Sequence, residues 1–264
     1  QLDEKFFASP ALALSAASDA IGAMARLART GVMSALDVLH HFDRHTIDVI
    51  DRNEDHIDAL ADSVDNYLIK LSSHVPPGHG NDLLNYYIQC FSEFERIGDF
   101  ERISDHAVNI LESAEELRGK GIEFSETAQQ ELQVLGEALR EIMDYAYRSF
   151  TAVDAQTARR IEPVEEVVDD MVATLRTNHI RRLRDGQCTV YAGLVFLDIL
   201  INAERIADQC SNLGVYTISQ FDPSVMNSHH EYIHRLHQGN DPVFNREYQE
   251  KHEKYFGMLS AIND

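Results

Sequence analysis

Apolar residues recur every three or four positions over long stretches of this chain, which is the period of an α-helix. Residues 83–118 show the pattern most clearly, with apolar side chains at Leu84, Ile88, Phe91, Phe94, Ile97, Phe100, Ile103, Ala107, Ile110, Ala114 and Leu117. No segment alternates strictly over the length of a strand. The pattern therefore predicts an all-α fold.

Turn signals are few, and they divide the helical pattern into long segments. The clearest are SHVPPGHGN at 73–81, Gly119-Lys120-Gly121, Asp185-Gly186 and Asp222-Pro223. The segments between them predict six helices, over 11–41, 43–73, 83–118, 125–153, 156–184 and 188–220. Pro163 either kinks the fifth helix or marks its true start. In the tail that follows, we expect short helices around Glu231 and Arg246.

An internal repeat relates the two halves of the chain. The segment ERISD at 101–105 recurs as ERIAD at 204–208, and Asn109 and Asn212 follow the two copies at the same distance. The preceding helix of each half carries acidic residues with matching three-then-four spacing, at Asp51, Glu54 and Asp58 and at Glu162, Glu165 and Asp169. The repeat predicts two tandem three-helix units, over 1–120 and 121–220, with a tail over 221–264 packing on them.

The charge balance excludes some classes of partner. Asp and Glu number 44 against 23 Lys and Arg, a formal net charge of -21. We therefore expect neither a nucleic acid nor an anionic membrane surface as the partner. Three cysteines without a CxxC fit a reducing compartment. No stretch approaches 18 consecutive apolar residues, so we expect no membrane span, and no signal peptide is visible.

The acidic residues of the repeat are the candidate site. Glu101 and Asp105 are neighbours on one helix face, because four residues advance a helix by slightly more than one turn. Such like charges repel unless they are solvated, paired with cations or bound to metal. Carboxylates are hard ligands, which suit magnesium, calcium, manganese or iron, with zinc as a further choice. A solvated face, or salt bridges with Arg102 and Arg205, remains the simpler interpretation, although it gives no reason for the repeat.

The sequence resembles a known family at these motifs. Residues 99–109 (DFERISDHAVN) and 202–212 (NAERIADQCSN) resemble the repeated E(D)xxxD signature of PhoU-type phosphate-regulatory proteins. The resemblance implies two tandem three-helix bundles that hold multinuclear metal clusters, commonly iron or zinc, with magnesium and manganese as alternatives. Residues 1–14, 161–169 and 179–188, and the tail from His230, are similar to the carboxy-terminal PhoU-like domain of bacterial sodium/phosphate cotransporters.

The resemblance implies a set of ligands in each unit. In the first unit these are Glu54, Asp58, Glu101 and Asp105, with Asp99 and Asn109 as adjuncts. In the second unit they are Glu165, Asp169, Glu204 and Asp208, with Glu162 and Asn212 nearby. The second unit has Asn202 and Gln209 where the first has Asp99 and His106. Because amides are poorer ligands than carboxylates or imidazoles, we expect the first unit to form the better metal site.

The resemblance further implies a regulatory, non-catalytic role. The chain would be the cytoplasmic domain of a sodium-dependent phosphate transporter, at the inner membrane, with the transmembrane portion of the same chain as its partner. A homo-oligomer is left open. Three alternatives remain: a free-standing PhoU-like adaptor in phosphate signalling, a ferritin-like di-metal oxidase and a plain helical scaffold. The oxidase is disfavoured because its paired ExxH motifs are matched only once, at Glu231 and His234.

Overall fold

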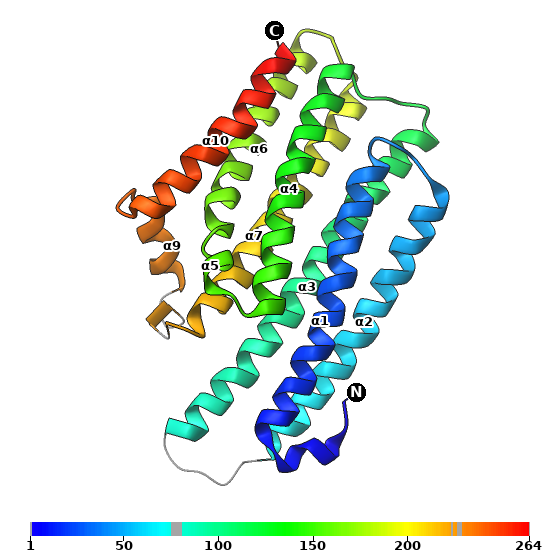
Figure 1. The fold of residues 1–264 in the computed structure, drawn as a ribbon. Coiled ribbons are helices and arrows are strands. Elements are labelled where there is room, and N and C mark those ends of the chain that lie inside the picture. The colour runs from blue at the N-terminus through cyan, green and yellow to red at the C-terminus, as the bar shows by residue number, and fades with distance from the viewer. Residues whose placement is uncertain (1, 75–80, 223, 226–228, 264) are drawn as a thin grey trace.

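The structure is a computed structural model that describes residues 2–74, 81–222, 224–225 and 229–263. Within these residues the chain is helical, and no strand occurs (Figure 1). A short 3-10 helix, η1 (Glu4–Ala8), precedes the first α-helix. The long helices of the body are α1 (Pro10–Val38), α2 (Arg44–Ser73), α3 (Asn81–Gly119), α4 (Glu126–Ala152), α6 (Ile161–Arg184) and α7 (Val190–Ser219). The all-α prediction is confirmed.

The fifth predicted helix is divided in two. A single turn, α5 (Ala155–Ala158), is separated from α6 by Arg159 and Arg160. Pro163 is the third residue of α6, so it marks the start of that helix and does not kink its middle. A proline in the first turn removes only an N–H that has no partner inside the helix. The predicted turn at 73–81 lies largely outside the described residues, as does Pro223.

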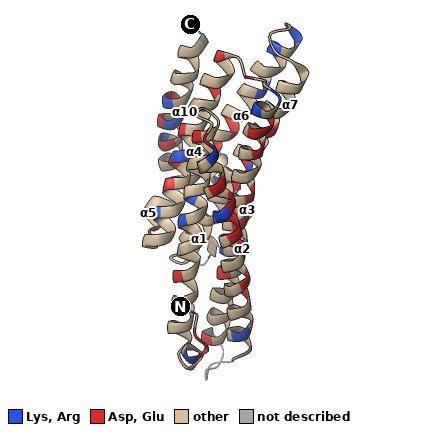
Figure 2. Ribbon diagram, turned by 90° about the vertical axis from the view of Figure 1, so that its right-hand side faces the viewer, with Lys and Arg blue, Asp and Glu red and all other residues tan. Residues whose placement is uncertain are grey.

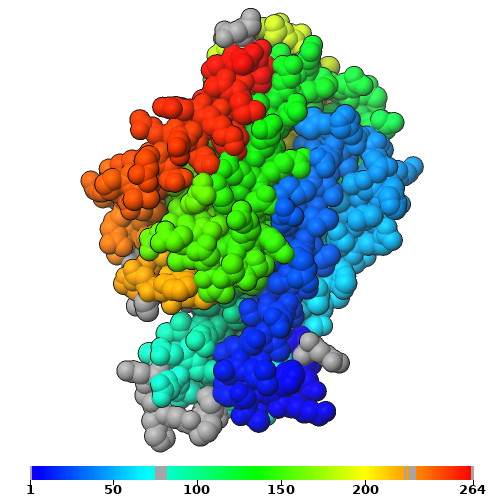
Figure 3. Space-filling model, viewed as in Figure 1, coloured from blue at the N-terminus to red at the C-terminus, as the bar shows by residue number. Residues whose placement is uncertain are grey.

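The tail is more regular than the sequence predicts. It forms α9 (His229–His237) and α10 (Pro242–Asn263), and α10 has 22 residues where we expected a short helix. Helix α10 packs against α4 and α6, and Figure 3 shows the orange and red tail lying along the green helices. The side chain of Tyr255 is fully buried in this contact.

The six long helices pack as two groups of three. Helices α1, α2 and α3 contact one another, and we call them the first bundle. Helices α4, α6 and α7 likewise form the second bundle. The bundles meet through α3 against α7 and α1 against α4, and one cluster of buried apolar side chains runs through both.

Helix α1 is a core helix of the first bundle. Its buried face consists largely of alanine and other small residues, which allow α2 and α3 to approach closely. By length and composition alone α1 is apolar enough to cross a membrane, although polar residues interrupt its apolar stretches.

Helices α3 and α7 run antiparallel and contact each other in a pattern with internal symmetry. The amide of Asn109 donates to Asn202 at 3.0 Å, and the amide of Asn212 donates to Asp99 at 3.4 Å. A shift of 103 residues interchanges these two pairs. The same shift interchanges the Tyr216–Glu95 and Ser113–Asp198 hydrogen bonds, of 3.1 Å and 3.2 Å. An approximate two-fold axis therefore passes through the middle of the interface.

Candidate metal centre

Two acidic groups lie where the repeat predicts them, one on each bundle. Figure 2 shows the Asp and Glu segments gathered along α2, α3, α6 and α7. The first acidic group comes from α2 and α3 and consists of Glu54, Asp58, Glu101 and Asp105. The second acidic group comes from α6 and α7 and consists of Glu165, Asp169, Glu204 and Asp208.

In the first acidic group, the negative charges act on one another. Burial, followed by repulsion from Asp58 and Asp105, raises the pKa of Glu54. Burial and then Asp58 raise the pKa of both Glu101 and Asp105. Among the described residues, none of the four carboxylates accepts a hydrogen bond or forms an ion pair. Asp58 and Asp105 are exposed, so water reaches this group.

The second acidic group is tighter and drier. One carboxylate oxygen from each of Glu165, Asp169 and Asp208 lies within 4.8 Å of the others. Burial, followed by repulsion from Glu162 and Asp169, raises the pKa of Glu165 to about 10. Burial and then Glu204 raise the pKa of Asp169 to about 7. Three acidic oxygens held this close favour either bound protons or a cation.

The residues of the second acidic group fit a metal ion by a further criterion. The Oδ1 atom of Asp169 is buried and has no hydrogen-bond partner among the described residues. Arginines reach only the outer members of the group. Arg205 lies 3.3 Å from Asp208 and Arg176 lies 3.7 Å from Glu204. A buried carboxylate oxygen without a partner is costly, and a cation would remove that cost.

The geometry favours the second unit as the better metal site, whereas the sequence favoured the first. Within the described parts of the chain, only the second bundle brings three ligand atoms within 4.8 Å of one another. We expected the first unit to be better because it carries Asp99 and His106. Both side chains instead face the α3–α7 interface, where Asp99 binds Arg102 at 2.7 Å and His106 contacts Asn202 at 2.9 Å.

The four residues that the sequence suggested as adjunct ligands do not all lie at the acidic groups. Asp99, Asn109 and Asn212 lie in the cross-bundle hydrogen bonds of α3 and α7 and outside the acidic groups. Glu162 lies one helical turn before Glu165 and is buried beside the second acidic group.

The sequence did not predict that a histidine of the tail lies beside the second acidic group. His237 of α9 contacts Glu162 through Nε2 at 2.8 Å and Glu166 through Nδ1 at 3.2 Å. The hydrogen bond to Glu162 raises the pKa of this imidazole despite its partial burial. Periodicity within the bundles could not place His237, because only the folding of the tail onto α6 brings it there.

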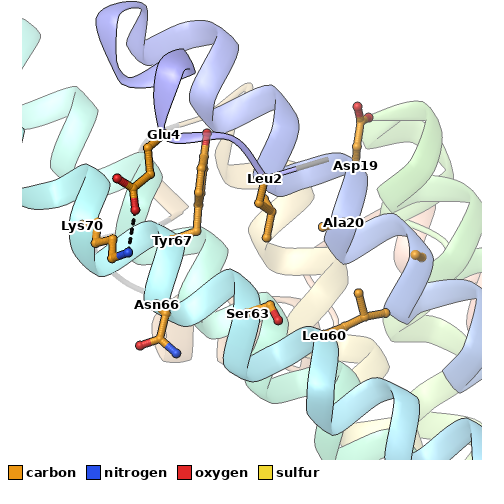
Figure 4. Close-up of a pocket in the computed structure, with 10 residues that line it drawn as sticks. Leu2, Glu4, Asp19, Ala20, Leu60, Ser63, Asn66, Tyr67 and Lys70 are labelled. Carbon is orange, nitrogen blue, oxygen red and sulfur yellow. Dashed lines mark hydrogen bonds and ion pairs between the residues drawn. The ribbon is translucent and has the colours of Figure 1, made fainter.

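A separate hollow lies between η1, α1 and α2 (Figure 4). Leu2, Leu60 and Tyr67 line it, and the Lys70 ammonium lies 2.5 Å from the Glu4 carboxylate across one side. Because both charged groups are already paired and exposed, this hollow is a weaker candidate site than the acidic groups.

Comparison with known proteins places both bundles in one family. The model of the PhoU domain matches residues 21–114 and 132–217. The tail helices α9 and α10 lie beyond the second matched segment.

Individual relatives agree with the family match. A phosphate-specific transport system accessory protein PhoU homologue from Thermotoga maritima is 30% identical over 115 residues, which cover 44% of this chain and 49% of that protein. The match thus spans about half of that relative. A homologue from Clostridium acetobutylicum is 22% identical over 195 residues, which cover 74% of this chain and 86% of that protein. The crystal structure of the phosphate transport system regulatory protein PhoU from Streptococcus pneumoniae superposes with a TM-score of 0.68 at 20% identity, over 81% of this chain and 98% of that one.

Proposed function

This chain belongs to the PhoU domain family, and we propose that it is a regulatory accessory protein of a phosphate transport system that acts in the cytoplasm. The family match over both bundles carries the proposal. The names of the relatives from Thermotoga maritima and Clostridium acetobutylicum, both accessory proteins of phosphate-specific transport, support it. We expect the role to be regulatory and not catalytic, because among the described residues the acidic groups offer cation ligands without an organised nucleophile.

The two acidic groups would bind metal in this function. Glu54, Asp58, Glu101 and Asp105 would hold one cluster, and Glu165, Asp169, Glu204 and Asp208 the other. Iron and zinc are the favoured metals, with magnesium and manganese as alternatives. The close oxygens and the unpartnered Oδ1 of Asp169 support this assignment for the second group. A bound cation would join α2 to α3 and α6 to α7 and would compensate their negative charge.

A second candidate is the regulatory domain of a sodium-dependent phosphate transporter. Its support is the similarity of residues 1–14 to the segment that follows the transmembrane half of such cotransporters. The partner would then be that transmembrane half. The similarity of the chain to most of the length of named accessory proteins favours the first candidate. The apparent mass of the native gene product, and its partition between membrane and supernatant, would separate the two.

Elemental analysis by ICP mass spectrometry tests the metal assignment. We expect several equivalents of a transition metal in the purified chain, reduced in Glu101→Ala and reduced independently in Glu204→Ala. Metal-free protein that resists reconstitution would contradict the assignment.

Phosphate uptake tests the regulatory role. Cells that lack the native gene should show altered uptake, restored by the wild-type gene. Uptake that is identical with and without the gene, at both high and low external phosphate, would contradict the role in phosphate transport.

A further inference from the structure

The C-terminal tail reaches the edge of the second acidic group through the imidazole of His237, which lies beside Glu162 and Glu166 of α6 and close to Glu165. Its Nε2 faces Glu162 at 2.8 Å and its Nδ1 faces Glu166 at 3.2 Å. The Ser211 hydroxyl donates to the other oxygen of Glu162, so that carboxylate is held from two sides. The residues come from α6, α7 and α9, and the site exists only while the tail is docked.

The three side chains converge on a shared point. One ligand atom each from Glu162, Glu165 and His237 lies within 4.8 Å of the other two. A second hollow lies between α6, α7 and α9, and Glu165, which is only 7% exposed, lines it together with Glu162 and His237. Among the described residues it has no hydrogen-bond or ion-pair partner. A buried carboxylate without a partner, beside an imidazole nitrogen and a second carboxylate, is an arrangement that a metal ion would satisfy.

We propose that Glu162, Glu165 and His237 form a distinct site for a divalent transition-metal ion, zinc or iron(II), that fastens the C-terminal tail to the second bundle. The proposal rests on the metal binding proposed above, since Glu165 would contribute to both sites. It assigns a ligand from outside the matched family segments, which end at residue 217.

The ligand chemistry selects the metal class. An imidazole with two carboxylates suits zinc and iron(II) better than magnesium or calcium, which take oxygen ligands. Three protein ligands would leave a coordination position for water. Glu166 is placed to accept from Nδ1–H of His237, which would direct the Nε2 lone pair toward the metal. Metal-binding histidines usually have such a carboxylate or carbonyl partner.

The first bundle has no counterpart of this site within the described residues. At the position of Ser211 it carries Val108, and Asp51, which has the spacing of Glu162, is exposed. The two acidic groups are therefore unequal because the tail reaches only one of them.

Zinc binding by the full-length chain tests the proposal. The chain is stripped with chelator and titrated with Zn²⁺, and Co²⁺ serves as a spectroscopic probe of nitrogen ligation. We expect His237→Gln to lose the equivalent assigned to this site and its Co²⁺ absorption band. The matched control is His234→Gln, an exposed histidine of the same helix. Glu166→Gln should weaken binding at this site by roughly 10- to 100-fold, the usual cost of losing the partner of a ligand histidine.

Hydrogen exchange of the tail gives an independent readout. Zn²⁺ should slow exchange of amides in α9 in the wild type and in His234→Gln, but not in His237→Gln. The proposal is overturned if His237→Gln takes up as much metal as the wild type and Zn²⁺ slows exchange in its α9 equally. That result would leave metal binding by the two acidic groups unaffected. If the wild type takes up no metal, the metal binding proposed for the acidic groups is overturned as well.

Discussion

At the scale of single residues, the second acidic group is defined by closely spaced carboxyl groups that burial and mutual repulsion keep protonated. Burial and repulsion raise the pKa of Glu165 to about 10 and that of Asp169 to about 7, from ordinary values of 4.5 and 3.8. The folded chain therefore binds protons that the unfolded chain releases. Each such group lowers the free energy of unfolding as the pH rises above its pKa in the unfolded chain. The decrease ends once the pH exceeds its raised pKa in the folded chain.

We predict that the metal-free protein is more stable at pH 5 than at pH 8. The unfolding free energy should fall by at least about 1 kcal/mol over that interval because the folded state must release bound protons. Urea denaturation in the presence of chelator measures it. Glu165→Gln, which cannot ionise, should flatten the slope. A slope unchanged by this substitution would mean that Glu165 is already ionised in the folded chain.

Residue spacing predicted the acidic groups because each ExxxD pair lies on one face of one helix. The positions of Asp99, Asn109 and Asn212 depend instead on the contact between α3 and α7, which spacing within one helix does not specify. The interpretation of these three residues as adjunct ligands is unsupported by their hydrogen bonds. Glu95 and Asp198, which occupy equivalent positions in the interface, were missed for the same reason.

At the scale of elements, close approach between helices fixes the start of α6. A Cβ atom added at Gly214 of α7 would lie 2.9 Å from Cδ1 of Ile161 and 3.3 Å from the carbonyl oxygen of Ala158. Ile161 directly precedes Glu162, so the position of the candidate tail site depends on this contact.

We predict opposite effects for two glycine substitutions. Gly214→Ala should destabilise the chain by about 1–3 kcal/mol, because overpacking forces α5 and α6 away from α7. Gly22→Ala, in α1, meets no atom within 4 Å and should stabilise the chain by roughly 0.5–1 kcal/mol through helix propensity. Thermal and urea unfolding of both variants measure the difference. If Gly214→Ala were as stable as Gly22→Ala, α7 would be able to move away from α5 and α6 without cost.

The sequence predicted long helices well and irregular segments poorly. Apolar periodicity located α1 to α4 and α7 to within a few residues, because each helix buries a continuous face. It ran α5 and α6 together, since the break at Arg159 and Arg160 contains neither Gly nor Pro. It underestimated α10, whose apolar face is completed only by α4 and α6.

At the scale of the whole molecule, a polar cluster fixes the tail to the second bundle. Glu141 of α4 accepts hydrogen bonds from Tyr145 at 2.9 Å and Lys254 at 3.1 Å, and also from Lys251 and Tyr255. Burial alone would raise the pKa of this carboxyl, but these donors outweigh it and lower the pKa to about 2.

We predict that Glu141→Gln loosens the tail at neutral pH. The loss should be about 1.5–3 kcal/mol, typical of hydrogen bonds to a charged group. Because the folded pKa is depressed, the contribution is present above about pH 4.5 and is lost as pH falls toward 2. The two proteins should therefore converge in stability below pH 4.5. Urea unfolding over this pH range measures the convergence, and Glu137→Gln, an exposed residue of the same helix, is the control. A constant difference would assign the effect to packing.

Metal removal should loosen both bundles. In protein shown by elemental analysis to contain metal, we expect chelation to lower the Tm by at least about 2–4 °C, which corresponds to about 1 kcal/mol for chains of this size class. Calorimetry with and without EDTA measures it. A melt that does not respond to chelation would contradict a structural role for the metal.

The symmetry of the α3–α7 interface bears on how this chain arose. A surface whose contacts interchange under a two-fold rotation is self-complementary, which is the property of a homodimer interface. A single-bundle ancestor bearing that surface would pair with a second copy of itself, each α3 lying antiparallel to the other. Duplication and fusion would preserve the contact while freeing the two halves to diverge. The asymmetry between the two acidic groups is then a specialisation that a strictly symmetric dimer cannot acquire, since any change to one subunit changes both.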